Sequence, residues 1–215
     1  MSPSMERPAT VALPDREGRA GWALDALFRA GLSADLGGAV IAPPHPLYGG
    51  SMDSPVVSEI AFACERAGIA SLRFDWRGVG ASAGEPSGEV ADAREDYDAA
   101  LDFLEDSVSP PLVAAGYSYG GATAALAGAR TTVRRLLLVA PPPAMMESSL
   151  VRDFKGKVFI AVGENDAISS PAELEAMARD LDHVTFDVLD ATDHFFMMGP
   201  GLEDLGQKAA VWLGG

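Results

Sequence analysis

The sequence has few of the features that mark secreted or membrane proteins. Its 215 residues contain a single cysteine, so no disulfide can form within the chain, in agreement with a reducing compartment. No apolar run approaches the ~20 residues that cross a bilayer. Residues 1–8 contain no apolar stretch of the kind found in a secretory leader. These absences predict a cytoplasmic protein that does not insert into membranes.

Basic residues are also scarce. The chain has 16 Lys and Arg against 31 Asp and Glu, which gives a formal net charge of −15. Such a surface repels nucleic acid and anionic lipid, so we expect no nucleic-acid partner. The sequence has no internal repeat and no low-complexity tract. We expect neither a metal ion nor a cofactor.

What is present is an alternation of short apolar strands with helical segments. The expected strands are residues 8–13, 20–29, 37–42, 69–75, 111–115, 135–140, 157–163 and 184–189, and the expected helices are 53–67, 88–106, 122–129, 171–181 and 202–213. Residues 20–29 are ambiguous, because Trp22 and Phe28 also fit a helix. The alternation predicts an α/β fold in one domain over residues 1–215. Its sheet should be mostly parallel, with about eight strands and helices on both faces.

One motif, at residues 116–120, carries the chemistry. It reads Gly-Tyr-Ser-Tyr-Gly and lies between an apolar strand and a run of small helix-forming residues. Gly-x-Ser-x-Gly in this context is typical of a nucleophile elbow, whose glycines let strand and helix approach each other. Ser118 is the expected nucleophile, and the Tyr119 N–H is the expected first donor to an oxyanion. The alternative is an ordinary strand-to-helix turn that contains a serine.

A serine nucleophile needs a base and an orienting carboxylate. Of the two histidines after the elbow, His183 precedes a strand and so falls at the wrong edge of the sheet. His194 follows the last strand and is the expected base. The acid should come from the loop after the strand between nucleophile and base, where Asp166 is our choice and Glu164 the alternative. Asp193 is expected to face solvent. The order serine, acid, histidine is that of α/β-hydrolase triads.

The second oxyanion donor should come from the loop after the third expected strand. Its prolines have no N–H, so Leu47 is our choice and Tyr48 the alternative. We expect His45 to make a hydrogen bond that fixes this loop rather than to take part in the chemistry. Asp75 and Arg77 are expected to organise the loop after the next strand.

Four segments resemble those of the α/β-hydrolase superfamily. They are residues 45–53 (His-Pro-Leu-Tyr-Gly-Gly-Ser-Met-Asp), 75–82 (Asp-x-Arg-Gly-x-Gly-x-Ser), 116–120 and 193–196 (Asp-His-Phe-Phe). Their order and spacing resemble small bacterial hydrolases from about residue 37 to the end of the chain. The resemblance implies a triad of Ser118, Asp166 and His194 and esterase-type hydrolysis. It also implies that residues 20–29 form an antiparallel strand at one end of the sheet.

The sequence departs from many members of that superfamily, which insert a helical cap after the strand that corresponds to residues 135–140. Here residues 144–156 are too few for a substantial cap, so we expect an open and shallow site. Met145, Met146 and the Phe-Phe-Met-Met run at 195–198 fit either an apolar acyl site or a core. The same residues would suit a homodimer interface.

The function predicted is hydrolysis of small carboxylic esters, with short to medium acyl chains favoured, through an acyl-enzyme on Ser118. The same apparatus cleaves thioesters, amides and lactones, and the motifs do not choose among these. A different class of answer is a hydrolase scaffold that binds a ligand or partner with little turnover. Dehalogenase-type chemistry is disfavoured, because it needs a carboxylate where Ser118 stands.

Overall fold

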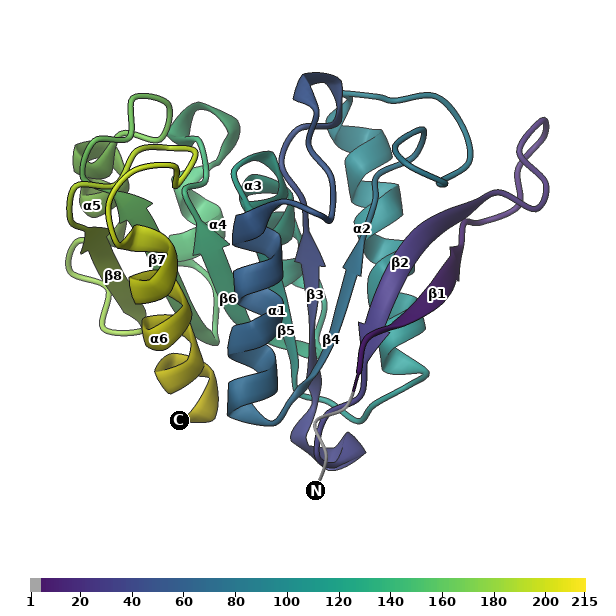
Figure 1. The fold of residues 1–215 in the computed structure, drawn as a ribbon, viewed down its shortest axis with the longest axis horizontal. Coiled ribbons are helices and arrows are strands. Elements are labelled where there is room, and N and C mark those ends of the chain that lie inside the picture. Colours follow the sequence, from purple (N-terminus) through teal and green to yellow (C-terminus); the bar gives the residue numbers. More distant parts are fainter. Residues whose placement is uncertain (1–4) are drawn as a thin grey trace.

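An eight-stranded sheet forms the centre of the structure (Figure 1). The computed structural model describes residues 5–215. Residues 1–4 lie outside the described residues, and the expectation of no secretory leader rests partly on them. In chain order the strands are β1 (Arg7–Ala12), β2 (Ala23–Arg29), β3 (Gly38–Ala42), β4 (Ala70–Phe74), β5 (Leu112–Tyr117), β6 (Val133–Val139), β7 (Lys157–Gly163) and β8 (Val184–Leu189). Across the sheet they are ordered β1-β2-β4-β3-β5-β6-β7-β8.

The sheet is mostly parallel, as predicted. Only the pairs β1–β2 and β2–β4 are antiparallel, and the other neighbouring pairs are parallel. The strand expected over residues 20–29 is therefore confirmed, and its helical alternative is wrong. Leu24, Ala26 and Phe28 alternate along β2 and face one core together, which is the period of a strand. The carboxyl ends of the parallel strands meet along the upper edge in Figure 1.

Helices cover both faces of the sheet, which also confirms the prediction. They are α1 (Pro55–Ala67), α2 (Val90–Glu105), α3 (Tyr119–Leu126), α4 (Ser148–Arg152), α5 (Pro171–Ala178) and α6 (Gly201–Gly214), with short 3₁₀ turns η1 (Ala34–Leu36), η2 (Pro46–Tyr48), η3 (Ala127–Ala129) and η4 (Pro143–Met145). Helices α1 and α6 pack against each other on the near face in Figure 1, whereas α2 and α3 cover the opposite face.

The central strands are buried on both faces. Along β3, Val40 and Ala42 belong to the core beneath α2 and α3, while Ala39 and Ile41 belong to the core beneath α1 and α6. Such strands read as continuous apolar runs rather than as alternating patterns. Burial on both faces explains why this strand stands out in the sequence as an uninterrupted apolar segment.

The chain between β6 and β7 is short. Within residues 5–215 it contains only η4 and α4 as regular elements, and no cap domain covers the upper edge of the sheet. Cys64 is fully buried in α1, where burial raises the pKa of its thiol to about 12, as expected for a structural cysteine. No helix in the described part of the chain has the length and apolar character required to span a membrane.

Candidate active site

The serine of the Gly-x-Ser-x-Gly motif occupies a strained turn. Ser118 joins β5 directly to α3 with φ 55° and ψ −120°, a conformation that costs about 1–3 kcal/mol for a residue with a side chain. Neither flanking glycine has room for a Cβ atom. At Gly116 it would lie 2.3 Å from the backbone of Gly120, and at Gly120 it would lie 2.4 Å from the Ala42 carbonyl oxygen. The two glycines thus let α3 pack against the ends of β5 and β3.

A chain of two hydrogen bonds links the three expected side chains. The Ser118 Oγ lies 3.0 Å from His194 Nε2, and His194 Nδ1 lies 2.8 Å from Asp166 Oδ2. Their relative exposures are only 8%, 5% and 6%, respectively. When the Nδ1–H of His194 donates its hydrogen bond to Asp166, Nε2 is unprotonated and can accept the Ser118 proton. The arrangement can therefore generate a serine alkoxide and hold the resulting imidazolium.

The Asp166 carboxylate is held by its own loop. Its Oδ1 accepts hydrogen bonds from the Ile168 N–H (2.9 Å) and the Ser169 N–H (2.6 Å). The Ser169 hydroxyl in turn donates to the Ala140 carbonyl at the end of β6 (2.6 Å). These hydrogen bonds fix the orientation of the carboxylate. One carboxylate oxygen of Asp166 thus accepts hydrogen bonds from its own loop, and the other contacts His194.

The loops after β7 and β8 are joined to each other, which places the acid beside the histidine. The Asn165 N–H donates to the Thr192 carbonyl (2.9 Å), and Gly163 lies so close that an added Cβ would be 2.3 Å from the same oxygen. The alternative acid, Glu164, accepts the Ala191 N–H (3.0 Å) and does not contact His194. Asp193 accepts the Met197 N–H (2.9 Å).

Sequence reasoning missed a residue that fixes the histidine. The Tyr117 hydroxyl donates to the His194 carbonyl (2.7 Å), and their rings lie 5.6 Å apart. Burial raises the Tyr117 pKa well above its usual value, so the hydroxyl remains a donor. Tyr117 is a variable position of the elbow motif, and its sequence context carries no signal for this role.

The loop after β3 lies beside the elbow. Trp76 Nε1 donates to the carbonyls of Pro43 (3.2 Å) and Pro44 (3.0 Å). In η2, the Leu47 N–H donates to His45 Nδ1 (3.2 Å), and the Tyr48 N–H donates to the His45 carbonyl (3.1 Å). The loop-fixing hydrogen bond expected of His45 is thus present.

These bonds bear on the second oxyanion donor. Both donors named from the sequence, the N–H groups of Leu47 and Tyr48, already have acceptors inside the turn. Within residues 5–215, the His45 N–H has none. It was overlooked in the sequence, although it is the first N–H after the proline pair at 43–44. His45 also lines the same groove as Ser118 and Tyr119.

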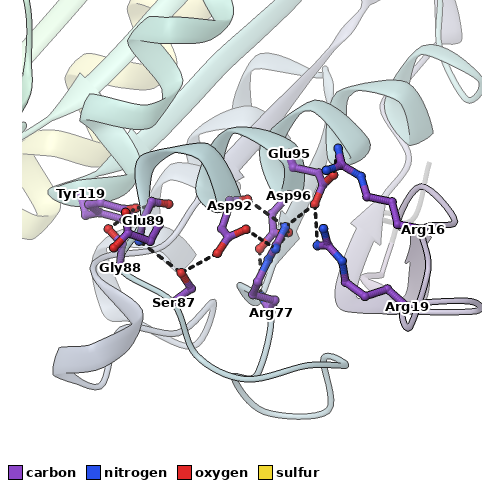
Figure 2. A network of polar contacts seen from close by, with 10 residues as sticks. All are labelled: Arg16, Arg19, Arg77, Ser87, Gly88, Glu89, Asp92, Glu95, Asp96 and Tyr119. Atoms are coloured by element: carbon purple, nitrogen blue, oxygen red, sulfur yellow. Dashed lines mark hydrogen bonds and ion pairs between the residues drawn. The ribbon is translucent and has the colours of Figure 1, made fainter.

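Arg77 organises the loop after β4, as predicted (Figure 2). Its guanidinium is buried and binds three acids at the start of α2: Nη1 lies 2.5 Å from Asp92, and Nη2 lies 2.8 Å from Glu95 and 2.6 Å from Asp96. Burial raises the pKa of Asp96 above its usual value, although the hydrogen bonds from Arg77 oppose that shift. Arg16 and Arg19 both pair with Glu95 from the β1–β2 connection.

The same network reaches the elbow through the segment before α2 (Figure 2). The Ser87 hydroxyl donates to Asp92 (2.7 Å), and the Tyr119 hydroxyl lies 3.3 Å and 3.4 Å from the carbonyls of Gly88 and Glu89. Asp75 holds the loop after β3, since its Oδ1 accepts the Met52 N–H (2.7 Å). The two residues named as loop organisers thus brace the turns on either side of the elbow.

An apolar groove of about 730 Å³ opens over Ser118. Its lining contains no Asp, Glu, Lys or Arg, and consists of Pro44, His45, Tyr48, Gly49, Gly50, Ser54, Pro55, Tyr117, Ser118, Tyr119, Pro142, Met145, Ile168, His194, Phe195 and Met197. Of the residues with two open interpretations, Met145, Phe195 and Met197 line this groove. Met146 and Phe196 are instead buried in the core. No group of three or more His, Cys, Asp or Glu within residues 5–215 is arranged to hold a metal ion.

Sequence comparisons identify relatives of this chain. The profile of a family described as serine aminopeptidase S33 matches residues 47–151, which include the elbow. An uncharacterised protein from Rickettsia prowazekii (strain Madrid E) is 31% identical over 173 residues, which cover 74% of this chain and 71% of that protein.

Solved structures extend the likeness to nearly the whole chain. An α/β serine hydrolase homologue from Coxiella burnetii has a TM-score of 0.82 at 26% identity and covers 96% of this chain and 97% of its own. An α/β serine hydrolase without lid from Xanthomonas campestris has a TM-score of 0.80 at 25% identity, with 97% and 94% covered. Est1E of Butyrivibrio proteoclasticus, solved with ferulic acid, shares the fold with a TM-score of 0.81 at 15% identity, with 95% and 97% covered.

Proposed function

This chain belongs to the α/β serine hydrolases without a lid, and from that premise we propose that it hydrolyses uncharged carboxylic esters through an acyl-enzyme on Ser118. The observation that carries the proposal is the unbroken chain of hydrogen bonds from Ser118 to His194 to Asp166, buried beneath an apolar groove. A cytoplasmic location and a homodimer stay predictions.

In the proposed mechanism His194 acts first as base and then as acid. Nε2 takes the Ser118 proton as Oγ attacks the ester carbonyl, and returns it to the alcohol that leaves. The acyl-enzyme remains. A water molecule, deprotonated by the same nitrogen, then attacks the acyl carbonyl and releases the acid and the free serine. Asp166 stays ionised throughout and stabilises the imidazolium.

The tetrahedral intermediates need two donors. The Tyr119 N–H is the first, because an elbow aims the N–H after its serine at the reacting carbonyl. For the second we propose the His45 N–H, which has no acceptor in the described chain, whereas the Leu47 N–H is engaged by His45 Nδ1. Leu47, the donor proposed from the sequence, would be available only if that bond opened.

The groove favours esters over the substrates of an aminopeptidase. An aminopeptidase has to accommodate the ammonium group of its substrate beside the scissile bond, and a buried cation requires a paired anion. The lining of this groove contains no carboxylate, since Asp166 lies behind His194. A neutral ester makes no such demand. The volume also lies in the range of ordinary small-molecule sites, roughly 300–1,000 Å³.

The test is hydrolysis of p-nitrophenyl esters from acetyl to dodecanoyl, with leucine p-nitroanilide beside them. Wild type and Ser118→Ala are compared on every substrate. We expect turnover of the esters, greatest for short to medium chains, and its loss in the variant.

Three outcomes would change the proposal. Faster cleavage of the anilide than of any ester would favour the aminopeptidase alternative. Ester turnover that survives in Ser118→Ala would remove the serine from the mechanism. If neither the esters nor the anilide are cleaved, and an acyl-CoA thioester assayed next is not cleaved either, the binding-scaffold alternative replaces the enzyme.

A further inference from the structure

The His45 side chain acts as a cap on a turn of the oxyanion loop. It is the N-cap residue of η2, and its Nδ1 accepts the Leu47 N–H at 3.2 Å. An acceptor at Nδ1 means that this nitrogen carries no proton, so the ring is neutral with its proton on Nε2. The cap closes the turn, and closure leaves the His45 N–H as the donor without an internal acceptor.

The ring is enclosed from three sides. Its centroid lies 4.5 Å from that of Tyr119 on α3 and 4.8 Å from that of Tyr48 on η2. The third side is the Gly88 backbone, where an added Cβ would lie 3.0 Å from the His45 Cε1. Gly88 and Tyr119 are in turn joined by the hydrogen bond of the Tyr119 hydroxyl drawn in Figure 2. The ring thus connects the oxyanion loop to the residue that follows the nucleophile.

We propose that His45 is a positioning residue of the hydrolase: its neutral imidazole keeps η2 closed, so that the oxyanion loop presents its free backbone N–H beside the Tyr119 N–H. The inference rests on the proposed function for its kinetic consequence, but the loop geometry on which it is built does not. His45 needs no contact with the reacting atoms through its side chain.

Protonation of the ring would undo this arrangement. A protonated imidazole donates from both nitrogens, so Nδ1–H would face the Leu47 N–H and the cap would be lost. The titratable groups that face the ring are Tyr48 from its own turn and Tyr119 from α3, and Glu89 follows Gly88 on the third side. Burial lowers the pKa of His45 below its usual value. The cap is therefore intact at neutral pH and is lost as the pH falls below about 6.5.

Three substitutions at this position separate the roles of ring and backbone. His45→Asn keeps an N-cap acceptor that does not titrate in this range. His45→Ala keeps the backbone N–H but removes the cap. His45→Pro removes the N–H as well, and proline fits the φ of −63° found here. The measurements are kcat and KM on the best ester between pH 5 and 9.

At pH 8 we expect His45→Asn to stay close to wild type, and His45→Ala to lose about fivefold in kcat with little change in KM, the effect of losing one N-cap. His45→Pro should lose roughly 10²–10³, the effect of removing an oxyanion donor. The kcat ratio of wild type to His45→Asn cancels the ionisation of His194. It should be flat above pH 7 and fall about fivefold at acid pH.

Two outcomes would overturn the inference. One is a His45→Asn variant no more active than His45→Ala, and the other is a kcat ratio that stays flat to pH 5. A second readout does not need turnover: in Ser118→Ala, the Leu47 amide NMR signal should titrate together with the His45 ring. A Leu47 signal that stays constant while His45 titrates refutes the cap. If wild type cleaves no ester but the two signals titrate together, only the proposed function has failed.

Discussion

The two ends of the sheet each carry a cavity with a histidine, yet only one of them is equipped for chemistry. At the carboxyl end, the groove of about 730 Å³ contains His194 between a serine and an acid. At the amino end, a cavity of about 800 Å³ contains His183, whose Nε2 donates to the Val151 carbonyl at 2.9 Å. Within residues 5–215, His183 has no carboxylate partner and no serine in hydrogen-bond reach.

The difference shows what builds the site. The cavity at the end without chemistry is of similar size, and it is lined by cations that include Arg134, Lys155 and Lys157. At the carboxyl end, the neighbouring parallel strands β5, β6, β7 and β8 are followed by loops that are hydrogen-bonded to one another. Convergence of strand ends, rather than cavity size, brings nucleophile, base and acid together.

The largest effect should come from Ser118→Ala, which removes the nucleophile and leaves the groove intact. We expect a loss of roughly 10⁴–10⁶ in kcat on p-nitrophenyl esters. The thermal unfolding temperature should not fall, because alanine leaves the packing of the elbow unchanged. An unfolded variant would make the loss of activity uninformative, so circular dichroism accompanies the assay.

Next in size is Asp166→Asn, with Glu164→Gln as its matched control in the same loop. The amide would hold His194 in the wrong tautomer, so kcat should fall on the order of 10⁴. Glu164 contacts only the Ala191 N–H, and its variant should stay within about threefold of wild type, given the small effect of most surface changes. A larger loss of kcat in Glu164→Gln than in Asp166→Asn would make Glu164, not Asp166, the residue that orients the histidine.

The Arg77 network should affect stability more than catalysis. Asp96→Asn removes the charge of the most buried acid beside Arg77, while Asp92 and Glu95 remain as partners. It should lower the free energy of unfolding by about 2 kcal/mol, since it weakens buried hydrogen bonds to a charged group. The control is Arg94→Gln, which breaks the partly exposed pair with Asp98 and should cost about 0.5 kcal/mol or less. Urea unfolding measures both. If both variants lose the same free energy of unfolding, the buried pair does not contribute more to stability than the exposed pair, and the prediction is wrong.

The smallest effect should come from the amino end of the sheet. His183→Ala removes one hydrogen bond to a backbone carbonyl and should leave kcat and KM within about twofold of wild type. The comparison between the two ends fails if this variant loses activity as His194→Ala does while remaining folded.

Most of the site could be predicted because its residues follow strand ends. Ser118 directly follows β5, and Asp166 and His194 lie in the loops after β7 and β8. Topology alone gathers such positions at one edge. For the acid the sequence leaves two candidates, because Glu164 lies in the same loop as Asp166. What separates the two is the turn in which Asp166 accepts the N–H groups of Ile168 and Ser169.

The second oxyanion donor that we propose was harder to choose from the sequence, for a physical reason. Which N–H is free depends on which others are consumed inside the turn, and that depends on a rotamer of His45. Tyr117 was missed for a similar reason, because its hydroxyl reaches a carbonyl 77 positions away in the sequence. Side-chain hydrogen bonds to distant backbone leave no periodicity in the sequence.

The uncovered groove has a consequence for the fate of the acyl-enzyme. With no cap over Ser118 within residues 5–215, we expect bulk water to reach the carbonyl of the proposed acyl-enzyme without a gating motion. An added alcohol competes with that water for the acyl group. Its share depends on its concentration and on its fit to the apolar walls of the groove, because no cap encloses it. Acyl transfer to alcohols such as methanol should therefore stay a minor reaction in dilute solution and grow in proportion to the alcohol added. For the proposed reaction we therefore expect the open site to favour hydrolysis over synthesis.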